Sequence, residues 1–440
     1  MNTMNNIFKF GRFLALATVA TFAFVACEDE PDKYEVAGGS PEVIYVIKPT
    51  NTDSLITSAF MGERVVLMGN NLRSITKLCF NDREAILNTS LITDHSLFVT
   101  VPSTLPDNPT DKIYMTNKAG EVTEFSFGVD VPAPQVSSLK CEQVKPGSIA
   151  TILGDYLLDY EEEPMKIKMP DGKEISSFES ISKTAVSFKV PEGCTKSGPI
   201  TVTTKYGSAT SKFYFNDDRG MLFNFESEMA HEAASIADGK FNHGWHPRDV
   251  KSDDTSLDGF YLQMGDGSSL LDLDGGWNDG QFSFEYWCGN WDGNFTPDAK
   301  LYEVVDFTNY EKMALKFEIN VPKSSPWTSG AMQIIFAPTS GDNGVTLSTA
   351  NNTHFNSNVL PRGMYRPWEA TGSFDTNGEW QTVTIPFSEF TYGADGTKAT
   401  GSLSPESFAS LTIFVWSGGV QGKDGTPIIK IDNIRAVSIK

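Results

Sequence analysis

Short alternations of apolar and polar residues run through most of the chain, separated by glycine, asparagine and aspartate. ALKFEINVP, AMQIIFAP and EWQTVTIPFSEF are examples from the C-terminal half. Such alternation is typical of β-strands that bury one face, and regular turn residues between short strands are typical of sandwiches. The best helical candidate, HEAASIADGK (231–240), covers only a few turns. The pattern therefore predicts an all-β protein.

Two segments of the N-terminal half repeat each other. GERVVLMGNNL (62–72) and GSIATILGDYL (147–157) each place two glycines seven residues apart, with an aliphatic run between them and a leucine three residues later. Each segment continues to a Val-Pro pair, at Val101 and Val190. We predict two immunoglobulin-like sandwiches, at residues 41–131 and 132–217.

This repeat resembles the IPT/TIG domain, whose early strand carries G-x-x-V-x-I-x-G-x-x-L and whose later strand ends in Val-Pro. The second copy departs from the pattern by a longer acidic loop, DYLLDYEEEP, after Gly154. The resemblance implies that both domains are spacers, and docking of another protein is the alternative.

The start of the chain has the features of a secretion signal. Lys9 and Arg12 precede an apolar run from Phe13 to Ala26, which is too short to span a bilayer as a mature helix. FVAC, ending at Cys27, resembles a bacterial lipobox, and the EDEPD that follows resembles an outer-membrane surface export signal. The resemblance implies a signal peptide at 1–26, a lipidated Cys27 and an acidic linker at 27–40. A plain secretory signal is the alternative.

The charge of the chain limits the kinds of ligand that it can bind. The 35 basic and 56 acidic residues give a formal net charge of -21, which excludes the basic surface that nucleic acid needs and disfavours anionic glycans and lipids. A neutral or cationic ligand is compatible with this charge.

Four cysteines remain after Cys27, too few for a disulfide framework, although Cys141 and Cys194 could pair or stay as buried thiols.

All eight tryptophans lie beyond Met221, and this change in composition predicts a separate C-terminal β-sandwich at 218–440. Several aromatics stand in polar loops such as KSSPWTSG, RGMYRPWEATG and DGGWNDG. Loop aromatics are expected on the surface, where a ring can stack on the apolar face of a sugar. The predicted glycan-binding residues are Trp327, Tyr365, Trp368, Trp287, Trp291 and Trp277.

The positions of two aromatics, Trp287 and Trp416, are left open between core and binding surface. Phe282, Phe284 and Tyr286 alternate along a strand that could form core and draw Trp287 inward. Trp416 shares a strand face with Phe414, so either the core or a concave binding face is open to it.

The lipobox, the tandem IPT-like domains and the Trp-rich sandwich together resemble the surface glycan-binding proteins of glycan-foraging Gram-negative bacteria. The resemblance implies a non-catalytic protein on the outside of the outer membrane that captures polysaccharide. It also implies as partners an outer-membrane transporter of the starch-utilization-system type and a surface glycanase. Trp327, Tyr365 and Trp368 would form the aromatic platform, and the ligand would be a neutral β-glucan such as xyloglucan or mixed-linkage glucan.

Two other functions are weighed against this one. A β-sandwich glycoside hydrolase needs two carboxylates across the scissile bond. The strand motif E-x-D-x-x-E is absent, and Glu285, Asp292, Glu303 and Glu369 show no pairing by spacing. An adhesin for host protein would use the same anchor and spacers, but protein interfaces usually mix in aliphatic anchors.

No cofactor is required by any motif. A structural Ca²⁺ is a weaker possibility, because FNFE (Glu226) and KIDNI (Asp432) resemble the ends of carbohydrate-binding sandwiches that calcium ties together.

Overall fold

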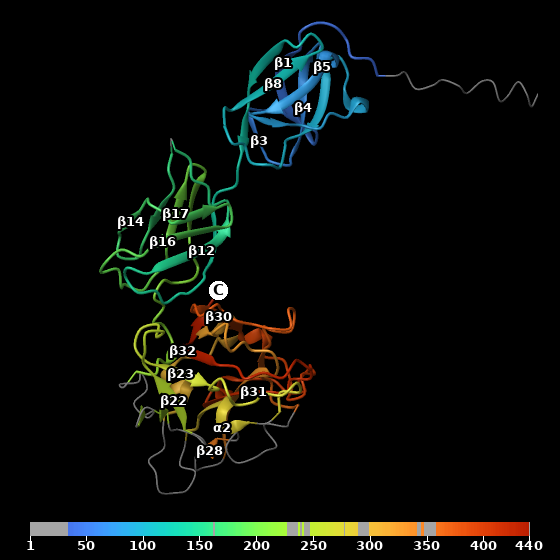
Figure 1. Ribbon diagram of the computed structural model, residues 1–440. Helices are drawn as coiled ribbons and strands as arrows, with labels where there is room; N and C mark the ends of the chain where they lie inside the picture. The colour runs from blue at the N-terminus through green and yellow to red at the C-terminus, as the bar shows by residue number, and fades with distance from the viewer. Residues whose placement is uncertain are drawn as a thin grey trace, which may run out of the picture. The chain divides into compact units, whose positions relative to one another are not determined.

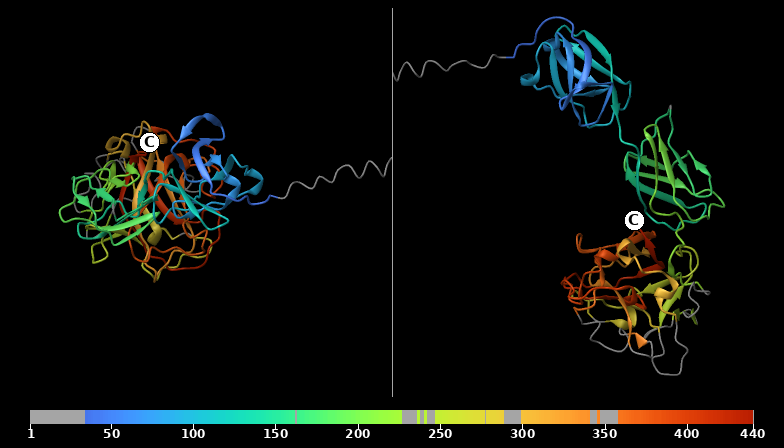
Figure 2. Two further views of the ribbon diagram at one scale, coloured as in Figure 1. Left: turned by 90° about the horizontal axis from the view of Figure 1, so that it is seen from above. Right: turned by 180° about the vertical axis from the view of Figure 1, so that it is seen from behind.

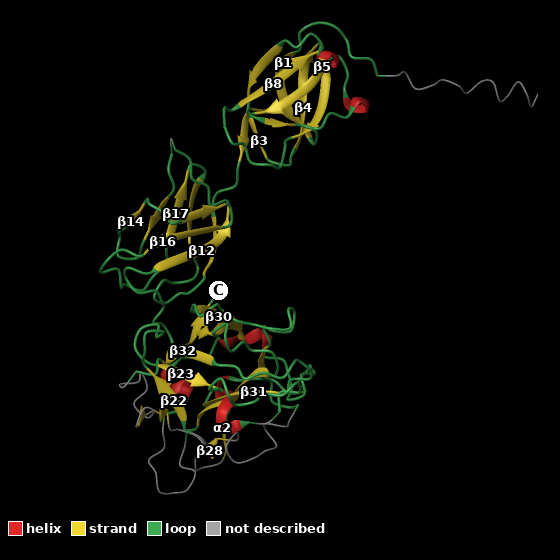
Figure 3. Ribbon diagram, viewed as in Figure 1, coloured by secondary structure: helices red, strands yellow, loops and turns green. Residues whose placement is uncertain are grey.

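The computed structural model describes residues 34–161, 163–226, 236–237, 240–241, 247–276, 278–288, 299–340, 345–346 and 358–439. Almost all regular structure in these ranges is β-strand (Figure 3), so the predicted all-β class is confirmed. The chain divides into two compact units, one ending at Pro132 and one beginning at Ala133. No helix in the described ranges is long and apolar enough to cross a membrane.

The first unit is a sandwich of two four-stranded antiparallel sheets, with strand orders β2-β1-β4-β7 and β6-β5-β8-β9 (Figure 1). A parallel pair of short strands, β3 and β10, lies beside them. The strands of the first unit are β1 Glu42–Lys48, β2 Asn51–Ile56, β3 Ser58–Phe60, β4 Arg64–Asn70, β5 Ile75–Phe80, β6 Arg83–Glu84, β7 Ser96–Thr100, β8 Lys112–Asn117, β9 Val122–Ser126 and β10 Gly128–Asp130. Two 3-10 turns, η1 Leu72–Ser74 and η2 Thr89–Leu91, lie between them. The alternate residues Val65, Leu67, Ile113 and Met115 fill the core.

The second unit begins with a sandwich of the same kind, with sheets β11-β12-β16-β15 and β14-β13-β17-β18. We call this sandwich the second module. Its strands are β11 Gln135–Leu139, β12 Ile149–Asp155, β13 Lys166–Lys168, β14 Glu174–Ile175, β15 Ser180–Ser182, β16 Ala185–Lys189, β17 Thr201–Thr204 and β18 Gly207–Thr210. Ile152, Ile167, Phe188 and Val202 belong to a core of its own. Cys141 and Cys194 are free thiols rather than a disulfide.

The rest of the second unit is a larger sandwich, which we call the C-terminal domain (Figure 2). Its first sheet has the order β20-β21-β22-β23-β32-β25-β30, and β19 also pairs with β32. These strands are β19 Met221–Phe223, β20 Ile236–Ala237, β21 Lys240–Phe241, β22 Arg248–Lys251, β23 Tyr261–Met264, β25 Met313–Asn320, β30 Gln381–Pro386 and β32 Ile429–Ser438.

The second sheet of this domain has the order β24-β31-β26-β29, and all its neighbours are antiparallel. Its strands are β24 Ser283–Tyr286, β26 Ala331–Ala337, β29 Gly363–Tyr365 and β31 Ser410–Trp416. The remaining elements are β27 Thr339–Ser340, β28 Val345–Thr346, α2 Asp279–Phe282, α3 Leu301–Val304, η3 Tyr310–Lys312, η4 Phe387–Glu389 and η5 Pro405–Ser407.

One hydrophobic core lies between the two sheets of the C-terminal domain. Leu315 and Phe317 of β25 and Ile431 of β32 belong to it, together with Phe284 of β24 and Ile413 of β31. Because side chains alternate along a strand, the intervening residues of each sheet point away from this core. Each sheet therefore has an outer face, and the two outer faces carry different chemistry.

Candidate functional site

The two tryptophans expected to lead the platform are buried. Trp327 is 0% exposed and its indole N–H donates to the carbonyl of Ser329 over 2.6 Å. Trp368 is 2% exposed and donates to the carbonyl of Gly330 over 2.8 Å. Both rings belong to the core of the C-terminal domain. The prediction that they stand exposed in loops is therefore wrong, because both rings pack in the core, and the backbone of Trp327 also pairs with that of Phe374.

Tyr365 faces the same core. It lies on β29 opposite Met332, a core residue, and its ring meets those of Trp327 and Phe317 edge-on, with centroids 6.0 and 6.4 Å away. Burial raises its pKa to about 12. The half-buried Tyr365 thus completes an interior aromatic group, and the predicted exposed stack of three rings is wrong.

The stretch around Trp287 divides between two faces. Phe282, Phe284 and Tyr286 are core residues, as the alternation predicts. Trp287 is 6% exposed and lies outside this core group, so its predicted exposure is also wrong. Trp291 and Trp277 lie outside the described residues, and so do Asp292 and Cys27.

The outer face of the sheet β24-β31-β26-β29 is polar and aromatic. Glu285 on β24 lies opposite Thr412 on β31, and Gln333 on β26 lies opposite Phe414. Trp416 ends β31 on this same face and packs against Phe414. Thr412 and Gln333 are 0% exposed and Phe414 is 3% exposed, so this face is covered, whereas Trp416 at the end of β31 is half-buried and reaches the surface.

A chain of hydrogen bonds holds the end of β31 that carries Trp416. The Gln333 amide Nε2 donates to the carbonyl of Trp416 over 2.8 Å, and Nη1 of Arg362 donates to Gln333 Oε1 over 2.8 Å. Arg362 is fully buried, and burial lowers its pKa to about 10, against the attraction of Asp395. The backbone below the indole is therefore fixed by side chains from two neighbouring segments.

Three loops converge beside Trp416. Nη1 of Arg366 donates to the carbonyl of Gly418 over 2.5 Å, and its guanidinium lies 6.0 Å from the ring centre of Tyr392. A Cβ on Gly396 would overlap the Gly418 carbonyl, so the loop of Tyr392 and the loop after Trp416 are in close contact. We call the half-buried Trp416, Met364, Arg366 and Tyr392, together with the exposed Asp395, the Trp416 surface.

Asp395 supplies an ionised carboxylate to this surface. The hydroxyl and the amide of Thr397 donate to its Oδ1 over 2.7 and 2.9 Å, and Asn358 Nδ2 donates to Oδ2 over 2.8 Å. Bonding by Thr397 lowers its pKa. Asp395 is thus a hydrogen-bond acceptor rather than a proton donor.

Sequence reasoning left Trp416 undecided and missed Tyr392 and Asp395. The signal for Trp416 was its shared face with Phe414, which the structure confirms as an outer face. The signal for the other two was TYGADGT, in which an aromatic ring and a carboxylate stand in a glycine-rich loop.

The described carboxylates near the aromatics have separate surroundings. Glu303 bonds Lys300 at the start of α3, and Glu369 pairs with Arg366 over 3.2 Å. Glu285 is buried within the outer face.

Of the calcium candidates, Asp432 lies on β32 of the other sheet, and Glu226 follows β19. Asp258 hydrogen-bonds Asp432 and interacts electrostatically with Glu226, whose Oε1 accepts the amide of Phe260 over 3.0 Å. Burial raises the pKa of both Asp432 and Glu226, and Asp258 adds to each shift. Across the described ranges, no three His, Cys, Asp or Glu residues are arranged to hold a metal ion. The calcium site stays a prediction.

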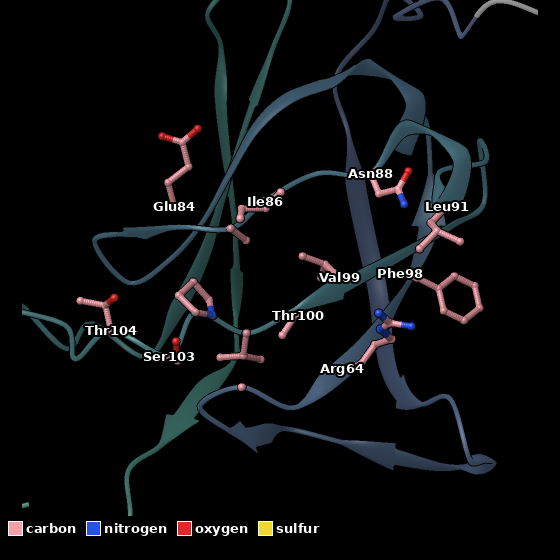
Figure 4. Close-up of a pocket in the computed structure, with 14 residues that line it drawn as sticks. Arg64, Glu84, Ile86, Asn88, Leu91, Phe98, Val99, Thr100, Ser103 and Thr104 are labelled. Atoms are coloured by element: carbon pink, nitrogen blue, oxygen red, sulfur yellow. The ribbon is translucent and has the colours of Figure 1, made fainter.

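A hollow of about 410 Å³ opens on the first unit (Figure 4). Arg64, Glu84, Ile86 and Asn88 line it, and Phe98 is its one aromatic side chain. With no tryptophan or tyrosine in its lining, it offers less for sugar stacking than the Trp416 surface.

The fold and the outer-face aromatics define a carbohydrate-binding β-sandwich attached to immunoglobulin-like modules. Residues 215–438 match the model of the surface glycan-binding protein B xyloglucan binding domain. The crystal structure of the surface glycan-binding protein PbSGBP-B from Prevotella bryantii is 40% identical, with a TM-score of 0.78 over 92% of this chain and 100% of that one. This chain belongs to the surface glycan-binding protein B family.

A curated relative, an IPT/TIG domain-containing protein of Bacteroides ovatus, is 25% identical over 233 residues. The match covers 49% of this chain and 46% of the relative, so the chain spans about half the length of that protein.

Proposed function

We propose that this protein binds a neutral β-glucan of the xyloglucan type at the Trp416 surface and does not cleave it. The observation that carries the proposal is the half-buried Trp416 on the outer face of a sheet, in a domain of the glycan-binding family. The domain's family is described by xyloglucan binding, which supports this ligand over other neutral glucans.

The chemistry of the surface suits a sugar polymer. The indole of Trp416 and the ring of Tyr392 can stack on pyranose faces, a contact of the kind that contributes about 1 kcal/mol beyond area burial. Arg366, Asp395 and Asn358 can exchange hydrogen bonds with sugar hydroxyls. A net charge of -21 permits a neutral polymer and opposes an anionic one.

The proposed setting is the outer face of the outer membrane. The FVAC sequence at Cys27 and the acidic run behind it support a lipid anchor there. An outer-membrane transporter of the starch-utilization-system type and a surface glycanase are the proposed partners, on the ground of family membership. Glycan binding itself would need no cofactor. A structural Ca²⁺ near Glu226 and Asp432 is a separate proposal, which a lower Tm in EDTA would support.

Affinity electrophoresis through gels that contain xyloglucan, mixed-linkage glucan or an acidic polysaccharide tests the function. We expect xyloglucan to retard the wild-type protein, and Trp416→Ala to lose at least tenfold in affinity with an unchanged circular dichroism spectrum. Trp380→Ala is the matched control, because Trp380 is also half-buried but lies by the other sheet and donates to the Thr255 carbonyl.

Three results would contradict the proposal. Equal retardation of wild type and Trp416→Ala would show that the glycan binds at another site. No retardation by any glycan would favour the adhesin. New reducing ends after incubation with xyloglucan would indicate an enzyme.

A further inference from the structure

The outer face of the larger sheet carries buried charges. Lys316 and Glu318 on β25 and Arg435 on β32 are 4%, 0% and 0% exposed. They alternate with core residues, so they point away from the hydrophobic interior. Burying a charge is costly unless an opposite charge and hydrogen bonds compensate it. These three residues therefore need partners on the outer side of the sheet.

One of those partners comes from the second module. Glu142 follows β11 and is itself only 3% exposed. Its Oε1 lies 2.5 Å from Lys316 Nζ, and its Oε2 lies 2.8 Å from Arg435 Nη2. Arg435 also pairs with Glu318, at 2.7 Å from Nη1 and 2.9 Å from Nη2. A single carboxylate of the module thus contacts both cations of the domain.

Backbone groups join the same contact. The hydroxyl of Thr382 on β30 accepts the amide of Glu142 over 2.7 Å and donates to Glu318 Oε1 over 2.8 Å. The amide of Thr382 donates to the carbonyl of Lys140 over 2.9 Å. These two bonds join the edge strand β30 of the domain to the backbone of the module at Lys140 and Glu142. Glu142 is therefore held by its backbone as well as by its carboxylate.

The charges balance only when both parts are counted. The C-terminal domain contributes two cations, Lys316 and Arg435, and one anion, Glu318. Glu142 supplies the second anion. Burial lowers the pKa of Arg435, but Glu318 and Glu142 outweigh it and raise the pKa above its ordinary value. Without Glu142 the sheet would bury an uncompensated positive charge.

We infer that Glu142 is an ionic lock that fixes the second module to the glycan-binding domain, so that residues 133–440 move as one rigid body. The inference goes beyond the proposed function, because no residue of this lock belongs to the Trp416 surface. Neutralising the lock is expected to free the module while leaving the binding surface intact.

The test uses the chain from residue 28 with Glu142→Gln, which keeps the shape of the side chain and removes its charge. Single-molecule fluorescence energy transfer between dyes on non-natural amino acids at the exposed positions Glu174 and Ser402 reports the orientation. We expect one narrow distribution for the wild type and a broadened one for Glu142→Gln. The Tm of the second unit should fall by about 5–15 °C. Glu179→Gln, an exposed carboxylate of the same module, is the control and should match the wild type.

A second variant keeps the inference testable if Glu142→Gln folds poorly. Glu142→Gln with Lys316→Met restores the charge balance, so it should regain at least half of the lost Tm while the transfer distribution stays broad. Xyloglucan affinity should remain within twofold of wild type in both variants, which separates failure of the lock from failure of the binding proposal. A narrow distribution and an unchanged Tm in Glu142→Gln would overturn the inference.

Discussion

Two buried indoles hold the same short segment of backbone. Trp327 donates to Ser329 and Trp368 donates to Gly330, the two residues that lead into β26. A buried indole N–H needs an acceptor, and an irregular segment that begins a strand has carbonyls to offer. These rings thus set the start of the strand that carries Gln333, which in turn holds the backbone of Trp416.

Replacing Trp368 tests this structural role. Trp368→Phe should reduce the free energy of unfolding by about 1–3 kcal/mol, because the carbonyl of Gly330 loses its donor. Trp368→Ala should cost about 3–5 kcal/mol because a large cavity is added. Urea unfolding measures both changes. A loss of glycan affinity with unchanged stability would indicate that Trp368 contacts the glycan, and would contradict its structural role in the core.

At the scale of elements, the repeated glycine motif has a direct physical reason. Gly69 in β4 and Gly154 in β12 lie where the neighbouring strand shifts register, between Val43 and Tyr45 and between Val136 and Ser138. A Cβ at either glycine would overlap a backbone carbonyl of that neighbouring strand. The second glycine of each motif is therefore required by a β-bulge.

Gly69→Ala should destabilise the first unit by about 3 kcal/mol, because the backbone of β1 must move to admit the methyl group. Gly38→Ala is the control, since a Cβ there meets no atom within 4 Å. Thermal unfolding followed by circular dichroism compares the two. Equal melting temperatures for both variants would mean that the bulge adapts without cost.

The strands were predictable and the positions of the loop aromatics were not. Alternation in ALKFEINVP gives the core-facing side of β25 directly, because the period of two is local, although the structure buries the other side as well. KSSPWTSG looks like a surface loop by composition, yet Trp327 pairs through its backbone with Phe374, a residue far along the chain. Whether a loop covers the end of a sandwich depends on such distant contacts, which composition does not encode.

For the whole molecule, the two outer faces of the C-terminal domain make different contacts. The larger sheet contacts the second module through charges, whereas the smaller sheet carries Trp416 and its polar neighbours. The net charge of -21 is consistent with a ligand that is held by stacking and hydrogen bonds.

Glycan affinity should therefore depend little on ionic strength. Raising NaCl from about 50 to 500 mM, which shortens the screening length severalfold, should change the Kd for xyloglucan by less than twofold. EDTA should have equally little effect, because Asp432 lies on the opposite sheet and Glu226 follows β19, a strand of that same sheet. Isothermal titration calorimetry measures both. A tenfold weakening in salt would indicate a cationic ligand in place of a neutral polymer.

The contact around Glu142 also has a mechanical consequence. A long polymer bound at the proposed Trp416 surface would transmit tension whenever its free end is dragged by flow or pulled by another binder. That load must cross from the C-terminal domain to the second module, and Lys316, Arg435 and Thr382 lie where it crosses. Short charge-assisted bonds sharing one carboxylate resist displacement together. Under tension, rupture of this junction would precede unravelling of either sandwich.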